Sequence, residues 1–195
     1  MKRFPLEQYA SLELNQVAFP QTGMVVSQTP LGSEFTAAAP CENGMWVLAD
    51  KAKGVIGSAA NVADTPIGIV YTAEKEYDMY HYGLKTFGRK VAGDYPRVGI
   101  LGLGDTVTTN CLQYDNESEF AAVTTSGSEK TSDEVLFAAL DNIATTPMYV
   151  TLVAGSPVPK LTATKPSSGI YGKVVKFYTV PNGEKGVKYQ IVSLG

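Results

Sequence analysis

Histidine is nearly missing from this sequence, which has a single one, His81, in 195 residues. Triad hydrolases use histidine as the base and most zinc sites use it as a ligand, so these classes of site lack raw material here. The sequence also has no His-Glu-x-x-His, Gly-x-Ser-x-Gly or Cys-x-x-Cys motif. We therefore expect a protein that is not an enzyme and that uses no cofactor and no metal ion.

Cysteine is scarce as well, with Cys41 and Cys111 as the two examples. Two cysteines are too few for a disulfide scaffold, and their spacing is not that of a metal site. They flank the centre of the chain and would pair if the fold brought its two ends together. Because free cysteine behaves as a small apolar residue, we expect two unpaired, partly buried thiols.

Clusters of basic residues and long apolar runs are also lacking. The net charge is −3 and the isoelectric point is near 5.2, which argues against a nucleic acid partner. No apolar run reaches the length of a membrane span, and the basic start of the chain has no apolar segment behind it. We expect a soluble protein that is not exported and that binds neither nucleic acid nor membrane.

Glycine and proline, in contrast, are plentiful, with 19 and 11 residues, which favours turns and short strands over long helices. Between Asn43 and Asn110, glycine, proline, aspartate and asparagine separate short β-prone runs: Met45–Ala49, Gly54–Ile56, Ile67–Thr72, Arg97–Leu103 and Thr106–Thr109. We predict a mainly β protein in which residues 43–110 form a small glycine-rich barrel of the β-barrel or β-tulip kind. Trp46, in its first strand, is expected to anchor the core.

Residues 1–40 have a different texture, without a sustained hydrophobic period and with several prolines. We interpret them as an extended N-terminal arm or edge segment and residues 41–195 as one β-rich domain. An extended segment has little to bury against itself, so the arm should pack on its own barrel or on another protein. The candidate partner-contact residues are its apolar side chains Phe4, Tyr9, Leu12 and Phe19.

The C-terminal part, residues 111–195, predicts one helix and one hairpin. Ser132 can cap a helix near 132–143 whose apolar residues share one face. Met148–Ala154 is β-prone, and the Pro/Ser/Thr/Lys-rich residues 155–169 indicate a surface crossing. Two further β-prone runs, Tyr171–Val180 and Val187–Ser193, flank Asn182-Gly183, which is a strong hairpin signal.

Two patterns invite a ligand-binding interpretation. Gly99-x-x-Gly102-x-Gly104 has neither the spacing of a dinucleotide loop nor a helix after it, so we exclude a nucleotide site. Carboxylates alternate at Glu74, Glu76 and Asp78, close to the tyrosines at positions 71, 77, 80, 82 and 95. That region is either a glycan surface with a carboxylate pair or a half-buried sheet face with an acidic, solvated edge.

Four segments in order carry a resemblance: Gly44–Asp50, Pro66–Val70, Tyr95–Gly99 and Gly104–Asn110. Their series of apolar strand, Pro-x-Gly-x-Val strand and Gly-Asp-Thr turn resembles small structural proteins of tailed-bacteriophage virions, the head decoration or cement proteins. The resemblance covers about the central third of the chain, and the long arm and C-terminal region exceed a minimal decoration module.

Two classes of function follow. The resemblance implies a non-enzymatic protein that is made in the host cytoplasm and lies on the capsid surface of the virion. There it would bind the major capsid protein and bridge neighbouring capsomers, with a homotrimer as one arrangement on the particle. The alternative is a carbohydrate-binding or glycan-processing β-domain of a phage particle, which would use the Tyr71–Tyr95 region.

Overall fold

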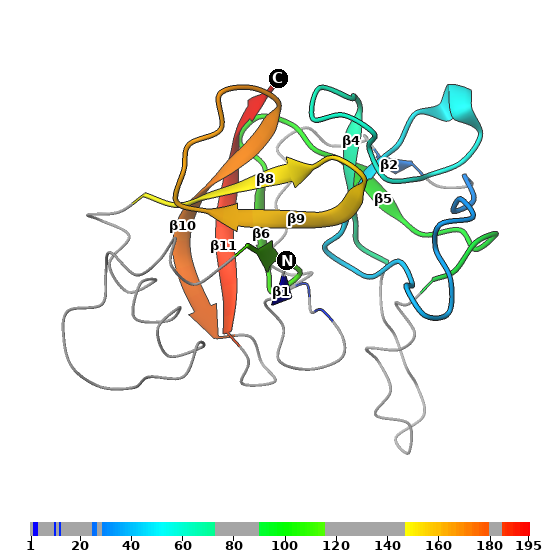
Figure 1. Cartoon of the computed structure of the whole chain (residues 1–195), viewed down its shortest axis with the longest axis horizontal. Helices are drawn as coiled ribbons and strands as arrows, with labels where there is room; N and C mark the ends of the chain where they lie inside the picture. The colour runs from blue at the N-terminus through cyan, green and yellow to red at the C-terminus, as the bar shows by residue number, and fades with distance from the viewer. Residues whose placement is uncertain are drawn as a thin grey trace, which may run out of the picture.

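The computed structural model describes residues 2–3, 10, 12, 25–26, 29–72, 90–115, 147–179 and 185–195. In this part of the chain the protein is mainly β, as predicted, and its strands form two sheets (Figure 1). The larger sheet curls into a half-barrel, which confirms a small, barrel-like β domain. The helix expected near 132–143 lies outside the described residues.

The larger sheet has seven strands among the described residues, in the order β1-β7-β9-β8-β10-β11-β6. Their bounds are β1 Lys2–Arg3, β6 Thr106–Thr109, β7 Gln113–Tyr114, β8 Tyr149–Val153, β9 Ser156–Thr162, β10 Ile170–Thr179 and β11 Lys185–Leu194. The predicted C-terminal hairpin is confirmed, because β10 pairs antiparallel with β11 from Ile170↔Leu194 to Thr179↔Lys185.

The smaller sheet has the order β2-β5-β4-β3, and its strands are β2 Val25–Val26, β3 Trp46–Leu48, β4 Ile67–Val70 and β5 Val98–Ile100. A short 3-10 turn, η2 Lys51–Lys53, follows β3. The strands of residues 43–110 are thus divided between the sheets, since β6 belongs to the larger one. The barrel-like curvature lies in the larger sheet, and most strands of that sheet are formed by residues after position 110.

Residues 155–169 do not form the surface crossing that their composition indicated, because β9 occupies Ser156–Thr162 and pairs with β8. The register jumps from Val153↔Ser156 to Thr151↔Lys160, so Pro157 and Pro159 sit in a bulge. A bulge tolerates proline because residues there do not need a ladder N–H. Gln113 and Tyr114 form β7, which pairs with β1 and β9.

Alternate residues of the apolar run Met45–Ala49 enter two different cores. Trp46 and Leu48 join a cluster with Ile69 and with Val107 and Tyr189 of the larger sheet. Met45, Val47 and Ala49 join a second cluster on the opposite face. Its other members are Ala10, Leu31, Phe35, Cys41, Ile56, Val70, Val98, Cys111 and Val158. The smaller sheet is therefore buried on both faces, which is why its strands are apolar at successive positions.

The described parts of residues 1–40 pack on this body. β1 and β2 form the outer strands of the larger and the smaller sheet, respectively. Leu31 and Phe35 are 3% and 2% exposed and belong to the second core cluster. Residues 31 and 35 thus pack on the smaller sheet, which is one of the two arrangements expected for the N-terminal arm.

Candidate functional site

Of the four candidate partner-contact residues, Leu12 is the one that the structure describes. Leu12 forms an isolated antiparallel bridge with Thr109 and packs, partly buried, against the larger core cluster. Its side chain therefore contributes to the protein's own packing. Phe4, Tyr9 and Phe19 lie outside the described residues.

The proposed glycan surface is described at two of its tyrosines. The guanidinium of Arg97 lies 5.1 Å from the ring centroid of Tyr71, and its Nε donates a 3.0 Å hydrogen bond to the Tyr71 hydroxyl. Tyr95 is 63% exposed. The carboxylates Glu74, Glu76 and Asp78, like His81, lie outside the described residues.

Neither cysteine forms a disulfide and both are fully buried, so the expectation that they do not pair with each other is confirmed, and their burial exceeds the expected partial burial. Burial is the main cause that raises the pKa of the Cys41 thiol, and the nearby Cys111 acts in the same direction. A buried thiol with a raised pKa is a poor nucleophile, because the thiolate is the reactive form.

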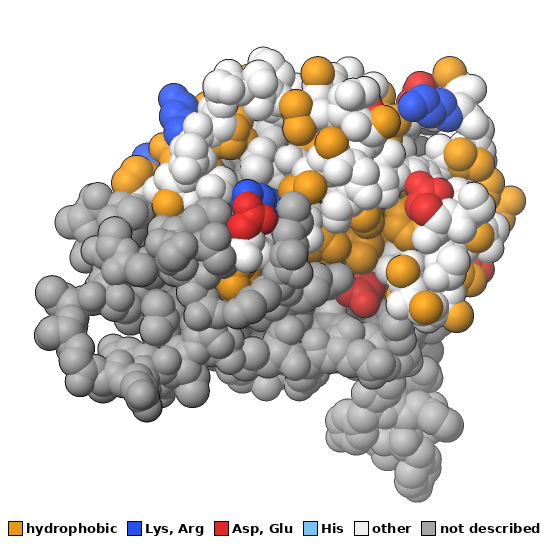
Figure 2. Space-filling view, in the orientation of Figure 1, with side chains coloured by type: hydrophobic (Ala, Val, Ile, Leu, Met, Phe, Trp, Pro, Cys, Tyr) orange, Lys and Arg blue, Asp and Glu red, His pale blue; other side chains and the backbone are white. Residues whose placement is uncertain are grey.

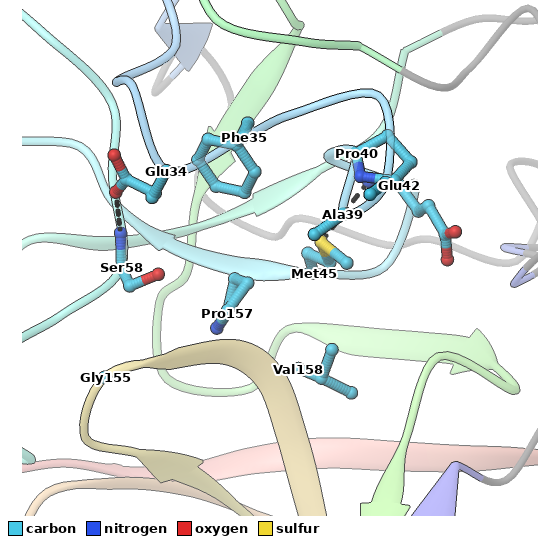
Figure 3. Close-up of a pocket in the computed structure, with 11 residues that line it drawn as sticks. Glu34, Phe35, Ala39, Pro40, Glu42, Met45, Ser58, Gly155, Pro157 and Val158 are labelled. Carbon is cyan, nitrogen blue, oxygen red and sulfur yellow. Dashed lines mark hydrogen bonds between the residues drawn. The ribbon is translucent and has the colours of Figure 1, made fainter.

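The described structure has a cleft of about 450 Å³. It lies between the loop of residues 34–45 and the start of β9 (Figure 3). Phe35, Pro40 and Met45 lie on one side, and Pro157 and Val158 lie on the other. The remaining lining residues are Glu34, Ala38, Ala39, Glu42, Ser58 and Gly155. The volume is in the usual range of ligand pockets.

Two carboxylates lie at opposite ends of this cleft in Figure 3. Glu34 is exposed, and its Oε1 accepts a 3.0 Å hydrogen bond from the backbone N–H of Ser58. Glu42 is 6% exposed, and its Oε2 accepts a 3.4 Å hydrogen bond from the N–H of Ala10. On the face shown in Figure 2, hydrophobic side chains fill the area between two acidic patches.

Two glycines leave the space that the Glu34 carboxylate occupies. A Cβ added at Gly32 or at Gly57 would overlap an oxygen of this carboxylate. The carboxylate thus rests against two backbone segments that carry no side chain, and it links them through Ser58. Its position is fixed by the fold, although the residue itself is exposed.

A second, smaller hollow of about 280 Å³ is mostly apolar. It is lined by Thr65, Pro66, Ile67, Ile100, Leu101, Gly102, Leu103, Ile170 and Leu194. Leu103 and Leu194 are 55% and 39% exposed. The hollow therefore offers apolar area where the start of β4 meets the C-terminal end of β11.

Sequence reasoning singled out neither Glu34 nor Glu42. The cleft combines the loop of residues 34–45 with Pro157 and Val158, more than a hundred positions later, so local patterns carry no sign of it. Gly32 and Gly57, whose missing side chains make room for Glu34, were the one available signal.

Comparison of the chain with protein-family models, with curated proteins and with solved structures found no match. Among the described residues, no helix is long and apolar enough to span a membrane. In the same part of the chain, no three His, Cys, Asp or Glu side chains gather as potential metal ligands.

Proposed function

We propose that the chain is a non-enzymatic structural protein of a bacteriophage virion that binds the outside of the capsid and bridges neighbouring capsomers. The observation that carries this proposal is the placement of the segments that resemble decoration proteins. Three of the four segments, Gly44–Asp50, Pro66–Val70 and Tyr95–Gly99, contain β3, β4 and most of β5, which are neighbours in one sheet, whereas Gly104–Asn110 contains β6 of the larger sheet. Segments that carry a resemblance and also form one unit in space support a shared architecture.

The packing of this unit suits a protein that acts through contacts. β3 and β4 are buried at every position, so the sheet is a rigid support for the surface around it. The proposed partner is the major capsid protein, and a homotrimer of this chain is the proposed arrangement on the particle. Because many copies bind one particle, a modest affinity at each site is sufficient to stabilise the shell.

The test uses particles made from the genome that encodes the chain, with its gene intact or deleted. We expect the protein in intact particles by mass spectrometry, and earlier genome release on heating of the deleted ones. Purified protein added back should restore survival. Absence from the particles, or equal survival with and without it, would overturn the proposal.

A variant tests the proposed contact residues separately. Replacing Phe4, Tyr9 and Phe19 by serine should abolish binding to particles; Leu12 is left unchanged because it packs on the core. The matched control replaces Val55 and Val62, 42% and 41% exposed, by serine and should bind normally. In parallel, the purified protein is assayed against polysaccharides. Glycan binding or cleavage together with equal particle survival would favour the carbohydrate alternative instead.

A further inference from the structure

The cleft between residues 34–45 and β9 combines negative charge with an apolar middle. We propose that it binds an arginine or lysine side chain presented by a partner protein. The inference depends on the cleft alone and holds whether or not that partner is a capsid protein.

Charge complementarity indicates a cation. The two ionisable side chains among the described lining residues are Glu34 and Glu42, and none of those residues is basic. Glu34 is exposed and Glu42 is 6% exposed, so the carboxylate that a cation reaches from solvent is that of Glu34, while Glu42 adds negative charge at the other end. A carboxylate with hydrogen bonds to guanidinium or ammonium gains a stronger, charge-assisted contact than a neutral pair does.

The apolar middle indicates a cation with a hydrocarbon stem. Met45, Pro157 and Val158 lie between the two carboxylates in Figure 3. Arginine and lysine bury their methylene stems along apolar surface while the charged group reaches a polar partner. A small inorganic cation would leave this apolar surface uncovered.

The cleft is also prepared for binding. Glu34 is held by the N–H of Ser58 and by the space at Gly32 and Gly57, so its carboxylate is ordered before a ligand arrives. Preorganised groups lose less entropy on binding, which favours affinity.

The experiment is an amide-resolved NMR titration of the full chain with three blocked tripeptides. They are acetyl-Gly-Arg-Gly-amide, its lysine analogue and its citrulline analogue, which keeps the shape of arginine without the charge. We expect saturable shifts at the amides of Phe35, Ser58 and Val158 with the two basic peptides. The citrulline peptide should bind up to about fivefold more weakly, as expected for loss of one ion pair near a surface.

Glu34→Gln provides the decisive variant. Glutamine keeps an oxygen that accepts the N–H of Ser58, so the fold is retained while the charge is lost. We expect a several-fold weaker affinity for the arginine peptide and a smaller salt dependence. Asp50→Asn is the matched control, because Asp50 caps Ala52 by a 2.9 Å hydrogen bond and does not line the cleft.

Three outcomes would overturn the inference. They are equal binding of the citrulline peptide, unchanged binding by Glu34→Gln, and no shifts at the cleft amides at millimolar peptide. A protein that binds the arginine peptide here but is absent from virions would support this inference and refute the proposed function, so the two are tested independently.

Discussion

The indole N–H of Trp46 donates a 3.0 Å hydrogen bond to the hydroxyl of Tyr189, and the two rings meet edge to face with centroids 5.9 Å apart. Both residues are fully buried, and they belong to different sheets. Gly172 permits this arrangement, because a Cβ there would lie 2.7 Å from Cδ2 of Tyr189. The pair therefore joins the two sheets by both packing and a polar contact.

Removal of the Tyr189 hydroxyl should destabilise the protein. Tyr189→Phe leaves a buried indole N–H without its acceptor, which costs about 1–3 kcal/mol in the free energy of unfolding. Trp46→Ala should cost more, about 3–5 kcal/mol, because it also leaves a cavity. Urea unfolding followed by circular dichroism measures both.

The control for this pair is Tyr171→Phe. Tyr171 and Tyr149 also meet edge to face at 5.9 Å, but both are only partly buried. The change should stay within about 0.5 kcal/mol. Equal costs at positions 171 and 189 would contradict the hydrogen bond between Trp46 and Tyr189. A solvent-like fluorescence of the single tryptophan in the native protein would contradict the burial of Trp46.

Two glycines with nearly the same backbone angle should respond differently to alanine. Gly44 has φ +91°, and a Cβ there would lie 2.6 Å from Cβ of Cys111 and 2.7 Å from Oγ1 of Thr109. Gly93 has φ +87° and open space around that position. Gly93→Ala should cost about 1–2 kcal/mol from the backbone alone. Gly44→Ala should cost about 2–5 kcal/mol, because overpacking adds to this strain.

Thermal and urea unfolding of both variants measure this difference. Both substitutions put the same methyl group on the same kind of backbone, so their difference isolates the contact with Cys111 and Thr109. If Gly44→Ala were no worse than Gly93→Ala, the close packing of this turn against Cys111 would be wrong.

The sequence indicated the fold class and the hairpin because both depend on local signals. Short β-prone runs ended by glycine and proline, and Asn182-Gly183 between two such runs, predict strands wherever the strands later pair. Pairing itself is non-local. Nothing in Thr106–Thr109 shows that β6 joins β11 and not the strands that precede it in the chain.

One sequence signal indicated that residues 29–40 cover a sheet face, but it was not followed to that conclusion. Met45–Ala49 is apolar at every position, and a strand of this kind is buried on both faces. One face is covered by the larger sheet, so the other requires a second cover. Leu31 and Phe35 provide it, but single apolar residues among prolines do not show which surface they meet.

The prolines of Ser156–Thr162 are the reason that β9 was not predicted as a strand. Pro157 and Pro159 made a strand look unfavourable, and only the bulge against β8 explains how the chain accommodates them. The cleft was unpredictable for a related reason, since its two walls come from distant parts of the chain.

The two thiols should be unreactive in the native protein. Cys41 and Cys111 are fully buried, and burial raises the pKa of the Cys41 thiol. A thiol reagent at pH 8 should therefore label neither until the protein unfolds, and labelling should track the unfolding transition. Denatured, unreduced protein should give two thiols per chain. Fewer than two would reveal a disulfide, and fast native labelling would contradict the burial.

Two aspartates should change stability with pH in opposite directions. Asp105 is buried; burial raises its pKa above the ordinary 3.8, and the 2.7 Å hydrogen bond from the N–H of Gly102 to Oδ2 opposes this shift. Its Oδ1 has no hydrogen-bond partner among the described residues. The pKa of Asp64 is lowered from 3.8, because the N–H groups of Asn61 and Ala60 donate to Oδ2 at 2.9 and 2.8 Å.

The sign follows from proton binding. Folded Asp105 keeps its proton to higher pH than the unfolded chain does, so its contribution to stability is present below pH 3.8 and is lost as pH rises through the folded pKa. Asp64 contributes above pH 3.8, and this contribution is lost as pH falls through its lowered folded pKa. The free energy of unfolding of the wild type minus that of Asp105→Asn should fall as pH rises above 3.8. The difference from Asp64→Asn should instead fall as pH drops below that value. Urea unfolding of the three proteins from pH 2.5 to 7 measures both curves; two flat or two parallel differences would refute the assigned environments.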